Sequence, residues 1–163
     1  MPMDAERLAV MPIFDSLDLR QRQSLALAMN EKSYLPGEAV FSQGDKAWSC
    51  YVVIEGQVEV RGRAGEEAER ALAMLHEGEL FGEVALLDGG RRSASCVAGP
   101  EGAALAELGR PEFDMIFNAG NQFAYRLMDL VAAQLVRRLR HASAQLAEAA
   151  VKEGWEGRDD EEG

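Results

Sequence analysis

The middle of the chain, residues 34–109, consists of short apolar runs separated by glycines. The runs that have the length and character of strands are Tyr51–Ile54, Val58–Val60 and Ala71–Leu75. Short strands at near-regular spacing, punctuated by turn residues, are typical of a β-sandwich or a β-barrel. The sequence Glu55-Gly56-Gln57 lies between the first two runs and predicts a tight hairpin.

Helical patterns flank this region on both sides. Asp18 and Gln21 have the spacing of a capping box, in which each side chain bonds the other residue's backbone N–H at a helix start. The apolar positions of this first helix and of its approach are Leu19, Leu25, Ala26 and Met29, preceded by Phe14 and Leu17. Pro111 suits the first turn of a short helix that reaches Phe117. After a break, residues 122–151 continue without glycine or proline.

The long C-terminal segment carries two apolar stripes. The first has the heptad spacing of a helix that pairs with another helix, at Met128, Ala132, Leu135, Leu139, Ala142, Leu146 and Ala149. The second lies beside it, at Leu127, Leu130, Val131 and Val136. Two apolar faces allow one helix to pack on its own domain and on a second copy, so the pattern predicts a homodimer through the 122–150 helix. The alternative is one wide face that packs only on the chain's own strands.

The composition is that of an acidic protein with one domain. The 163 residues carry 28 acidic and 17 basic side chains, a formal net charge of −11. This charge argues against nucleic-acid binding, which needs a positive surface to displace counterions from phosphates, but it leaves room for a local anion pocket. The sequence has no apolar stretch of membrane-spanning length and no signal-peptide pattern. With the isolated Cys50 and Cys96 as free thiols, these features predict a cytoplasmic protein without membrane insertion.

Two classes of enzyme are not expected. His76 and His141 are the two histidines, and they lie far apart without a metal-ligating spacing. This argues against a bound metal and against the metal-dependent cupin enzymes, which need clustered histidines. The sequence also offers no nucleophile and base for nucleotide hydrolysis. We therefore expect a binding protein rather than an enzyme.

The candidate chemistry is concentrated in residues 81–95, Phe-Gly-Glu-Val-Ala-Leu-Leu-Asp-Gly-Gly-Arg-Arg-Ser-Ala-Ser. Gly82 permits close approach of the backbone, and residues 83–87 can form a helical turn whose free N–H groups attract an anion. A tight turn then brings Arg92 to the same anion, and its planar guanidinium suits phosphate. Because Glu83 would accept a hydrogen bond from a sugar hydroxyl, the stretch predicts a site for a phosphorylated sugar. The alternative is a structural ion pair between Glu83 and Arg92.

Further patterns precede this stretch: Gly37-Glu38, Phe41, Gln43-Gly44-Asp45, Tyr51–Ile54, Gly56, Val58 and Val60. Together with residues 81–95, they resemble the cyclic nucleotide-binding domains of the catabolite activator and protein kinase A regulatory subunit type, over about residues 10–147. The resemblance implies an α+β, mainly β fold. This is an eight-stranded β-roll (jelly roll) with an N-terminal helix, a short helix in the phosphate-binding cassette and a long C-terminal helix. The implied boundaries are 1–32 for the helical lead-in, 33–110 for the roll with the cassette at 81–95, 111–151 for the C-terminal helices and 152–163 for an acidic disordered tail.

The resemblance also implies a set of ligand contacts. Glu83 would accept from the ribose 2′-OH, and Arg92 would bind the cyclic phosphate. The backbone N–H groups of Ala85 and Ser93, with the Ser93 hydroxyl, would bind phosphate oxygens, and Gly82 would let the ribose approach. The other implied contacts are Phe81, Val84, Ala94, Val60, Leu72, Leu75, Arg138, Ala142 and Ser143. The last two match two hydroxyl residues that touch adenine in the catabolite activator branch, with alanine here in place of the first.

The expected function is that of a cyclic nucleotide sensor. Cyclic AMP is favoured over cyclic GMP, because Arg92-Ser93-Ala94 is more similar to the cassettes of cyclic AMP binders. Bound ligand would favour one placement of the long helix over another. The sequence ends at Gly163 without the helix-turn-helix of catabolite activators, which predicts an output through an unknown partner protein. The alternative is a protein-interaction module that kept the fold and lost the ligand.

Overall fold

The computed structural model describes residues 2–63 and 65–154, with only the backbone described at residues 85 and 86. From residue 155 onward, the predicted acidic tail lies outside the described residues. The elements, in chain order, are α1 (Ala5–Ala9), η1 (Pro12–Phe14), α2 (Leu19–Ala28), β1 (Met29–Tyr34), β2 (Ala39–Phe41), β3 (Ser49–Gly62), β4 (Arg70–Leu75), β5 (Leu80–Phe81), α3 (Glu83–Asp88), β6 (Ser95–Gly109), α4 (Arg110–Asn118) and α5 (Gln122–Lys152).

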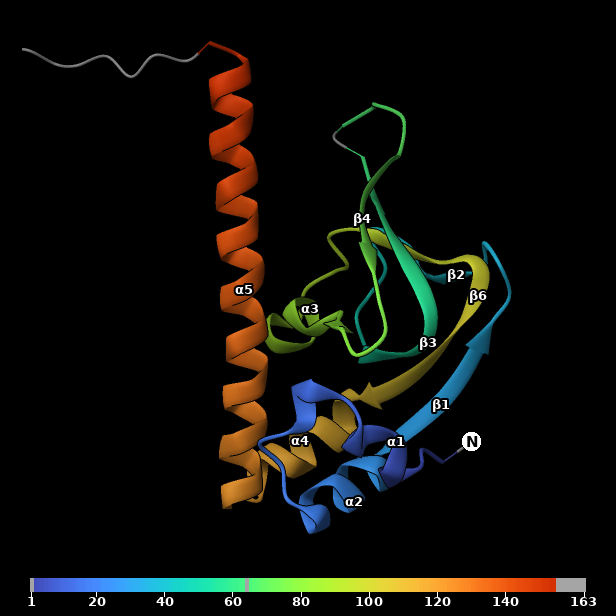
Figure 1. Ribbon diagram of the computed structural model, residues 1–163, viewed down its shortest axis with the longest axis vertical. Helices are drawn as coiled ribbons and strands as arrows, with labels where there is room; N and C mark the ends of the chain where they lie inside the picture. The colour runs from blue at the N-terminus through green and yellow to red at the C-terminus, as the bar shows by residue number, and fades with distance from the viewer. Residues whose placement is uncertain (1, 64, 155–163) are drawn as a thin grey trace, which may run out of the picture.

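The strands form one antiparallel sheet in the order β1–β6–β3–β4, with β2 paired to β6 and β5 paired to β3. The two long strands, β3 and β6, pair from Ser49 opposite Gly109 to Arg61 opposite Ser95. Figure 1 shows these strands curving around the roll, with α5 standing beside it. This arrangement confirms the predicted α+β, mainly β class.

The predicted hairpin at Glu55-Gly56-Gln57 is wrong, because β3 continues through these residues. Its register against β6 shifts on both sides of Gly56. Gly56 has a φ of +79° and lies so close to β6 that an added Cβ would be 2.3 Å from the Gly102 carbonyl oxygen. Gly102 itself has a φ of +78°. The long strands therefore bend together at these glycines. Among the described residues, six strands form the sheet where eight were predicted, because each bend joins two segments into one strand.

The N-terminal helices lie below the sheet, at one end of the roll (Figure 1). The predicted capping box of α2 is confirmed, since the Gln21 N–H donates to Asp18 Oδ1 at 2.8 Å and the Asp18 N–H donates to Gln21 Oε1 at 3.0 Å. The predicted anchors Phe14 and Leu17 are both buried. Leu19, by contrast, is exposed, because it opens the first turn of α2 on the outer side of the helix.

Alternate residues of β3 serve two separate apolar clusters. The helix-side cluster contains Cys50, Val52 and Ile54 together with residues of the N-terminal helices, α4 and α5. The roll-interior cluster contains Tyr51, Val53 and Val58 with residues of β4, β5 and β6. Because side chains alternate between the two faces of a strand, one continuous apolar run supplies both clusters.

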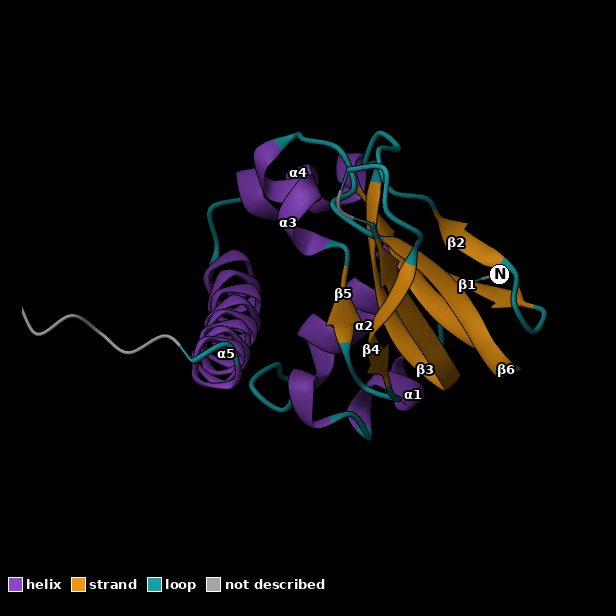
Figure 2. Cartoon of the chain, turned by 90° about the horizontal axis from the view of Figure 1, so that it is seen from above, coloured by secondary structure: helices purple, strands orange, loops and turns teal. Residues whose placement is uncertain are grey.

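The last two helices, α4 and α5, follow β6. Pro111 lies in the first turn of α4, and the Asn121 side chain caps α5 by accepting from the Ala124 N–H at 3.1 Å. The side chains that α5 buries all lie in its first half, at Ala124, Leu127, Leu130, Val131 and Gln134. From Leu139 to Ala149 every residue is exposed. Figure 2 shows α5 almost end-on, at one side of the sheet. Among the described residues, no helix is both long and apolar enough to cross a membrane.

Candidate functional site

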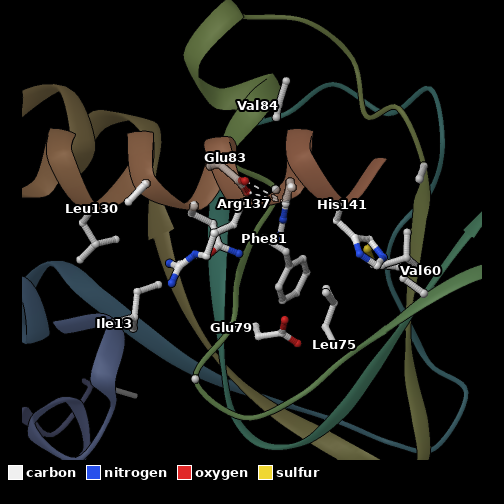
Figure 3. A pocket seen from close by; sticks show the side chains of 18 of the residues that line it. Ile13, Val60, Leu75, Glu79, Phe81, Glu83, Val84, Leu130, Arg137 and His141 are labelled. Atoms are coloured by element: carbon white, nitrogen blue, oxygen red, sulfur yellow. Dashed lines mark hydrogen bonds and ion pairs between the residues drawn. The ribbon is translucent and has the colours of Figure 1, made fainter. Parts of the chain in front are cut away.

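A cavity of about 1130 Å³ lies between the roll, the cassette and α5 (Figure 3). Of the predicted ligand contacts, those that line it are Val60, Leu75, Phe81, Gly82, Glu83, Val84, Arg92, Ser93, Ala94, Arg138 and Ala142. The fold thus brings residues from β3, β4, β5, α3, the loop before β6 and α5 to one space. This volume is ample for a small-molecule ligand.

The cassette folds as the sequence predicts, with glycines at both ends of α3. Gly82 and Gly89 have φ values of +79° and +69°, in the left-handed region that glycine adopts at little cost. An added Cβ at position 82 would lie 2.7 Å from Nη1 of Arg92, so a side chain there would displace the guanidinium. Asp88 stabilises the following turn by accepting from the Gly90 N–H at 2.8 Å. These features hold Glu83 and Arg92 on the same wall of the cavity.

Glu83 is a buried carboxylate that faces α5. The residue is 1% exposed, and both its carboxylate oxygens accept from Nη1 of Arg138, at 2.8 and 3.1 Å. Arg138 also donates to the Leu80 carbonyl oxygen. Burial raises the pKa of the Glu83 carboxyl, and the charge of Arg138 opposes that rise. The alternative of a structural ion pair between Glu83 and Arg92 is wrong, since the partner of Glu83 is Arg138.

Arg92 is a buried cation held by carbonyl oxygens and an aromatic ring. It is 5% exposed, and its guanidinium donates to Gly82 O at 2.8 Å and to Ser49 O. The guanidinium carbon lies 4.0 Å from the ring centroid of Phe41. Among the described residues, Nε of Arg92 has no hydrogen-bond partner and no carboxylate forms an ion pair with the side chain. A buried charge with an unpaired donor favours an anionic ligand, because an uncompensated buried polar group is costly.

Among the described side chains, two predicted contacts, Leu72 and Ser143, are not among the residues that line the cavity. Leu72 is 56% exposed and packs over Gly62. It lies where the register of β4 against β3 shifts, since Ala73 pairs with Val60 and Ala71 with Arg61. Ser143 is exposed on α5. The backbone of Ala85 lies in α3, so its N–H stays a predicted phosphate donor.

The cavity also has lining residues that were not predicted from the sequence. Among those on α5, Gln134 and His141 lie four and three residues from Arg138, and Arg137 directly precedes it. Residues three and four apart share a helix face, so the prediction of Arg138 could have extended to Gln134 and His141. Among the described residues, no group of histidine, cysteine, aspartate or glutamate side chains is arranged to hold a metal ion.

Residues 31–119 match the family described as cyclic nucleotide-binding domain. The chain belongs to this family. The cyclic AMP receptor protein of Thermus thermophilus is 39% identical over 137 residues, which are 83% of this chain and 60% of that protein. The cAMP-dependent protein kinase type II regulatory subunit of Drosophila melanogaster is 34% identical over 83% of this chain and 36% of its own length. The chain therefore spans three fifths or less of these relatives.

Solved structures agree with this assignment. The catabolite activator protein of Thermus thermophilus aligns with a TM-score of 0.71 and 36% identity, over 85% of this chain and 63% of that one. A cyclic nucleotide-binding domain from Methylobacillus flagellatus aligns with a TM-score of 0.79 over 89% of this chain and 81% of that one; at 19% identity this likeness concerns the fold alone. The predicted family and fold class are confirmed. The relatives are a receptor and a regulatory subunit, in line with the expected non-enzymatic role.

Proposed function

We propose that this cyclic nucleotide-binding domain binds cyclic AMP in preference to cyclic GMP and acts as a sensor. The observation that carries the proposal is the buried Arg92, whose unpaired Nε and aromatic support suit a phosphate on the cavity wall. Glu83 lies on the same wall and suits a sugar hydroxyl. The names of the two sequence relatives, one a cyclic AMP receptor and one a subunit of a cAMP-dependent kinase, support cyclic AMP as the ligand.

In this proposal the cassette binds the sugar and the phosphate. Arg92 turns part of its guanidinium from the carbonyl oxygens of Gly82 and Ser49 to the cyclic phosphate. The backbone N–H groups of Ala85 and Ser93 and the Ser93 hydroxyl supply further donors, as at other anion sites next to a helix start. Glu83 accepts from the ribose 2′-OH.

The same contacts would connect the ligand to α5. Arg138 reaches from α5 and donates to both carboxylate oxygens of Glu83. A ribose hydroxyl that donates to one of these oxygens would compete with the hydrogen bond from Arg138. A ligand shifts a conformational equilibrium only through such differential contacts. We propose that the two placements of α5 differ in the Arg138–Glu83 pair, and that a partner protein recognises the exposed half of α5.

A homodimer through α5 is part of the proposal. The heptad residues Leu139 and Leu146 are 69% and 71% exposed, as the packing on a second copy would require. Sedimentation equilibrium should give a dimer for the wild type and a monomer for the variant with Leu139→Asp and Leu146→Asp. A wild type that remains monomeric at high micromolar concentration would contradict the proposed homodimer.

Titration calorimetry with cyclic AMP and cyclic GMP tests ligand binding. At a hundredfold excess over Kd, bound ligand should add about 2.7 kcal/mol to the free energy of unfolding. Arg92→Ala removes several charge-assisted hydrogen bonds and should weaken binding about a hundredfold or more. The matched control is Arg91→Ala, because the exposed Arg91 donates to Gly44 O, away from the cavity.

A second candidate is the interaction module without a ligand. The observation in its favour is that Glu83 is already bound by Arg138, and that both terminal nitrogens of Arg92 already bond carbonyl oxygens. Absence of binding by either nucleotide at millimolar concentration, or equal effects of the Arg91 and Arg92 variants, would favour this candidate over the sensor.

A further inference from the structure

The two ends of the cavity differ in chemistry. Toward one end, between η1 and the first half of α5, the lining includes the carboxylates Asp15 and Asp129, and the turn between β4 and β5 adds Glu77 and Glu79. Toward the other end, between β3, β4 and the second half of α5, the lining is formed by Val60, Ala73, Met74, Leu75, Cys96, His141 and Ala142. A purine has apolar faces and a polar edge, so it fits the second end, where aliphatic side chains can cover its faces and one side chain can bond its edge.

His141 lines the cavity from the same helix as Arg138. It follows Arg138 by three residues on α5, so it lies about 4.5 Å farther along the same helix face. Arg138 marks the sugar position, because it contacts Glu83 at 2.8 Å. In Figure 3, His141 projects from α5 into the cavity on the side where Val60 and Leu75 are drawn.

We propose that His141 reads the purine, with one ring nitrogen hydrogen-bonded to the substituent at position six of the base. This inference rests on the proposed function, since it assigns the residue that completes the same site. A neutral imidazole has one donor and one acceptor nitrogen, so it can bond either an amino or an oxo group. His141 therefore contributes affinity for the purine.

The neighbouring side chains at this end of the cavity are poorly suited to the task. Ala73 and Ala142 have no polar side-chain atom, and a thioether or thiol, as in Met74 and Cys96, is only a weak hydrogen-bonding group. The Cys96 residue is also 4% exposed. His141 combines an exposed position with a ring that can bond the base edge and contact its face.

The test is a cycle of two protein forms and two ligands, measured by calorimetry. The ligands are cyclic AMP and the 3′,5′-cyclic phosphate of purine riboside, which has hydrogen in place of the 6-amino group. The wild type should bind cyclic AMP about three- to tenfold more tightly than the analogue, the effect of one hydrogen bond. His141→Ala should bind both ligands with equal, weaker affinity. His76→Ala is the matched control, since His76 is the other histidine and is exposed away from the cavity, and it should behave as the wild type.

Each outcome separates the two proposals. If the wild type binds neither ligand, the proposed function fails. If the wild type binds but His141→Ala keeps the same ratio between the ligands, the assignment of His141 is overturned while the sensor stands. His141→Phe retains an aromatic ring without a hydrogen bond, so preservation of the ratio in this variant would also overturn the hydrogen bond. The unfolding temperature of each variant without ligand should equal that of the wild type, and His141→Gln provides a second, polar substitution if His141→Ala unfolds.

Discussion

The two apolar clusters share strand β3 but have different tasks. The helix-side cluster packs aliphatic and aromatic side chains of the N-terminal helices, α4 and α5 against one face of the sheet. The roll-interior cluster lies on the other face, where the Arg92 guanidinium lies over the rings of Phe41 and Tyr51, and Phe81 stacks on Tyr51. The comparison shows that a buried cluster can accommodate a neighbouring charged side chain when suitable groups surround the charge.

The difference arises from the groups that face each cluster. Arg92 is tolerated beside the roll-interior cluster because two carbonyl oxygens accept its N–H groups and the Phe41 ring covers its face. We therefore expect substitutions in the helix-side cluster to change stability alone, and substitutions in the roll-interior cluster to change ligand binding as well.

The largest expected effect is the loss of a buried side chain from the helix-side cluster. Leu25 of α2 is 1% exposed, so Leu25→Ala should lower the free energy of unfolding by about 2–5 kcal/mol, through lost burial and the cavity left behind. Leu27, on the same helix, is 83% exposed, and Leu27→Ala should change stability by less than about 0.5 kcal/mol. Urea denaturation followed by circular dichroism measures both. Equal losses would mean that α2 does not pack as described.

An intermediate effect concerns pH, and it applies to both clusters. Burial raises the pKa of the Cys50 thiol in the helix-side cluster and of the Cys96 thiol in the roll-interior cluster, each from 9.0 to about 12. Between pH 9 and 12 the folded chain therefore binds more protons than the unfolded chain, so stability falls as the pH rises. Each thiol should contribute a slope of about 1.4 kcal/mol per pH unit.

Denaturation curves at several alkaline pH values test this effect. Cys50→Ala and Cys96→Ala should each flatten the decline by one thiol's share, whatever their effect on stability at neutral pH. If the decline of stability with pH is unchanged in one variant, the thiol in that cluster is accessible to solvent, which would contradict its burial.

The smallest expected effect separates the clusters by ligand binding. Phe41→Leu removes the ring that lies 4.0 Å from the Arg92 guanidinium carbon. It should weaken cyclic AMP binding about five- to thirtyfold, which corresponds to about 1–2 kcal/mol for a desolvated cation–π contact. The matched control is Phe113→Leu, because Phe113 belongs to the helix-side cluster, where it stacks on Phe117 at 4.2 Å. This control should lower stability and leave affinity unchanged. Equal losses of affinity in the two variants would contradict the distinction between the two clusters.

Local features of the fold could be predicted because neighbouring residues decide them. The capping box of Asp18 and Gln21, Pro111 at the start of α4, and the start of α5 at Gln122 all follow from backbone groups a few residues apart. The hairpin prediction at Gly56 failed for the opposite reason. A glycine with positive φ serves a turn or a bend equally well, and the choice depends on Gly102, which is distant in sequence.

The chemistry of the cassette follows from the residue types of one short segment. Gly82, Glu83 and Arg92 lie close together in the sequence, and their types and spacing are sufficient to indicate an anion site. How these groups are paired depends instead on elements that are distant in the sequence. Glu83 bonds Arg138, and Arg92 bonds Ser49 and lies over Phe41, because the packing of α5 and of β2 and β3 places these groups within reach. Long charged side chains have several possible partners in sequence, and only the geometry of packed strands and helices selects among them.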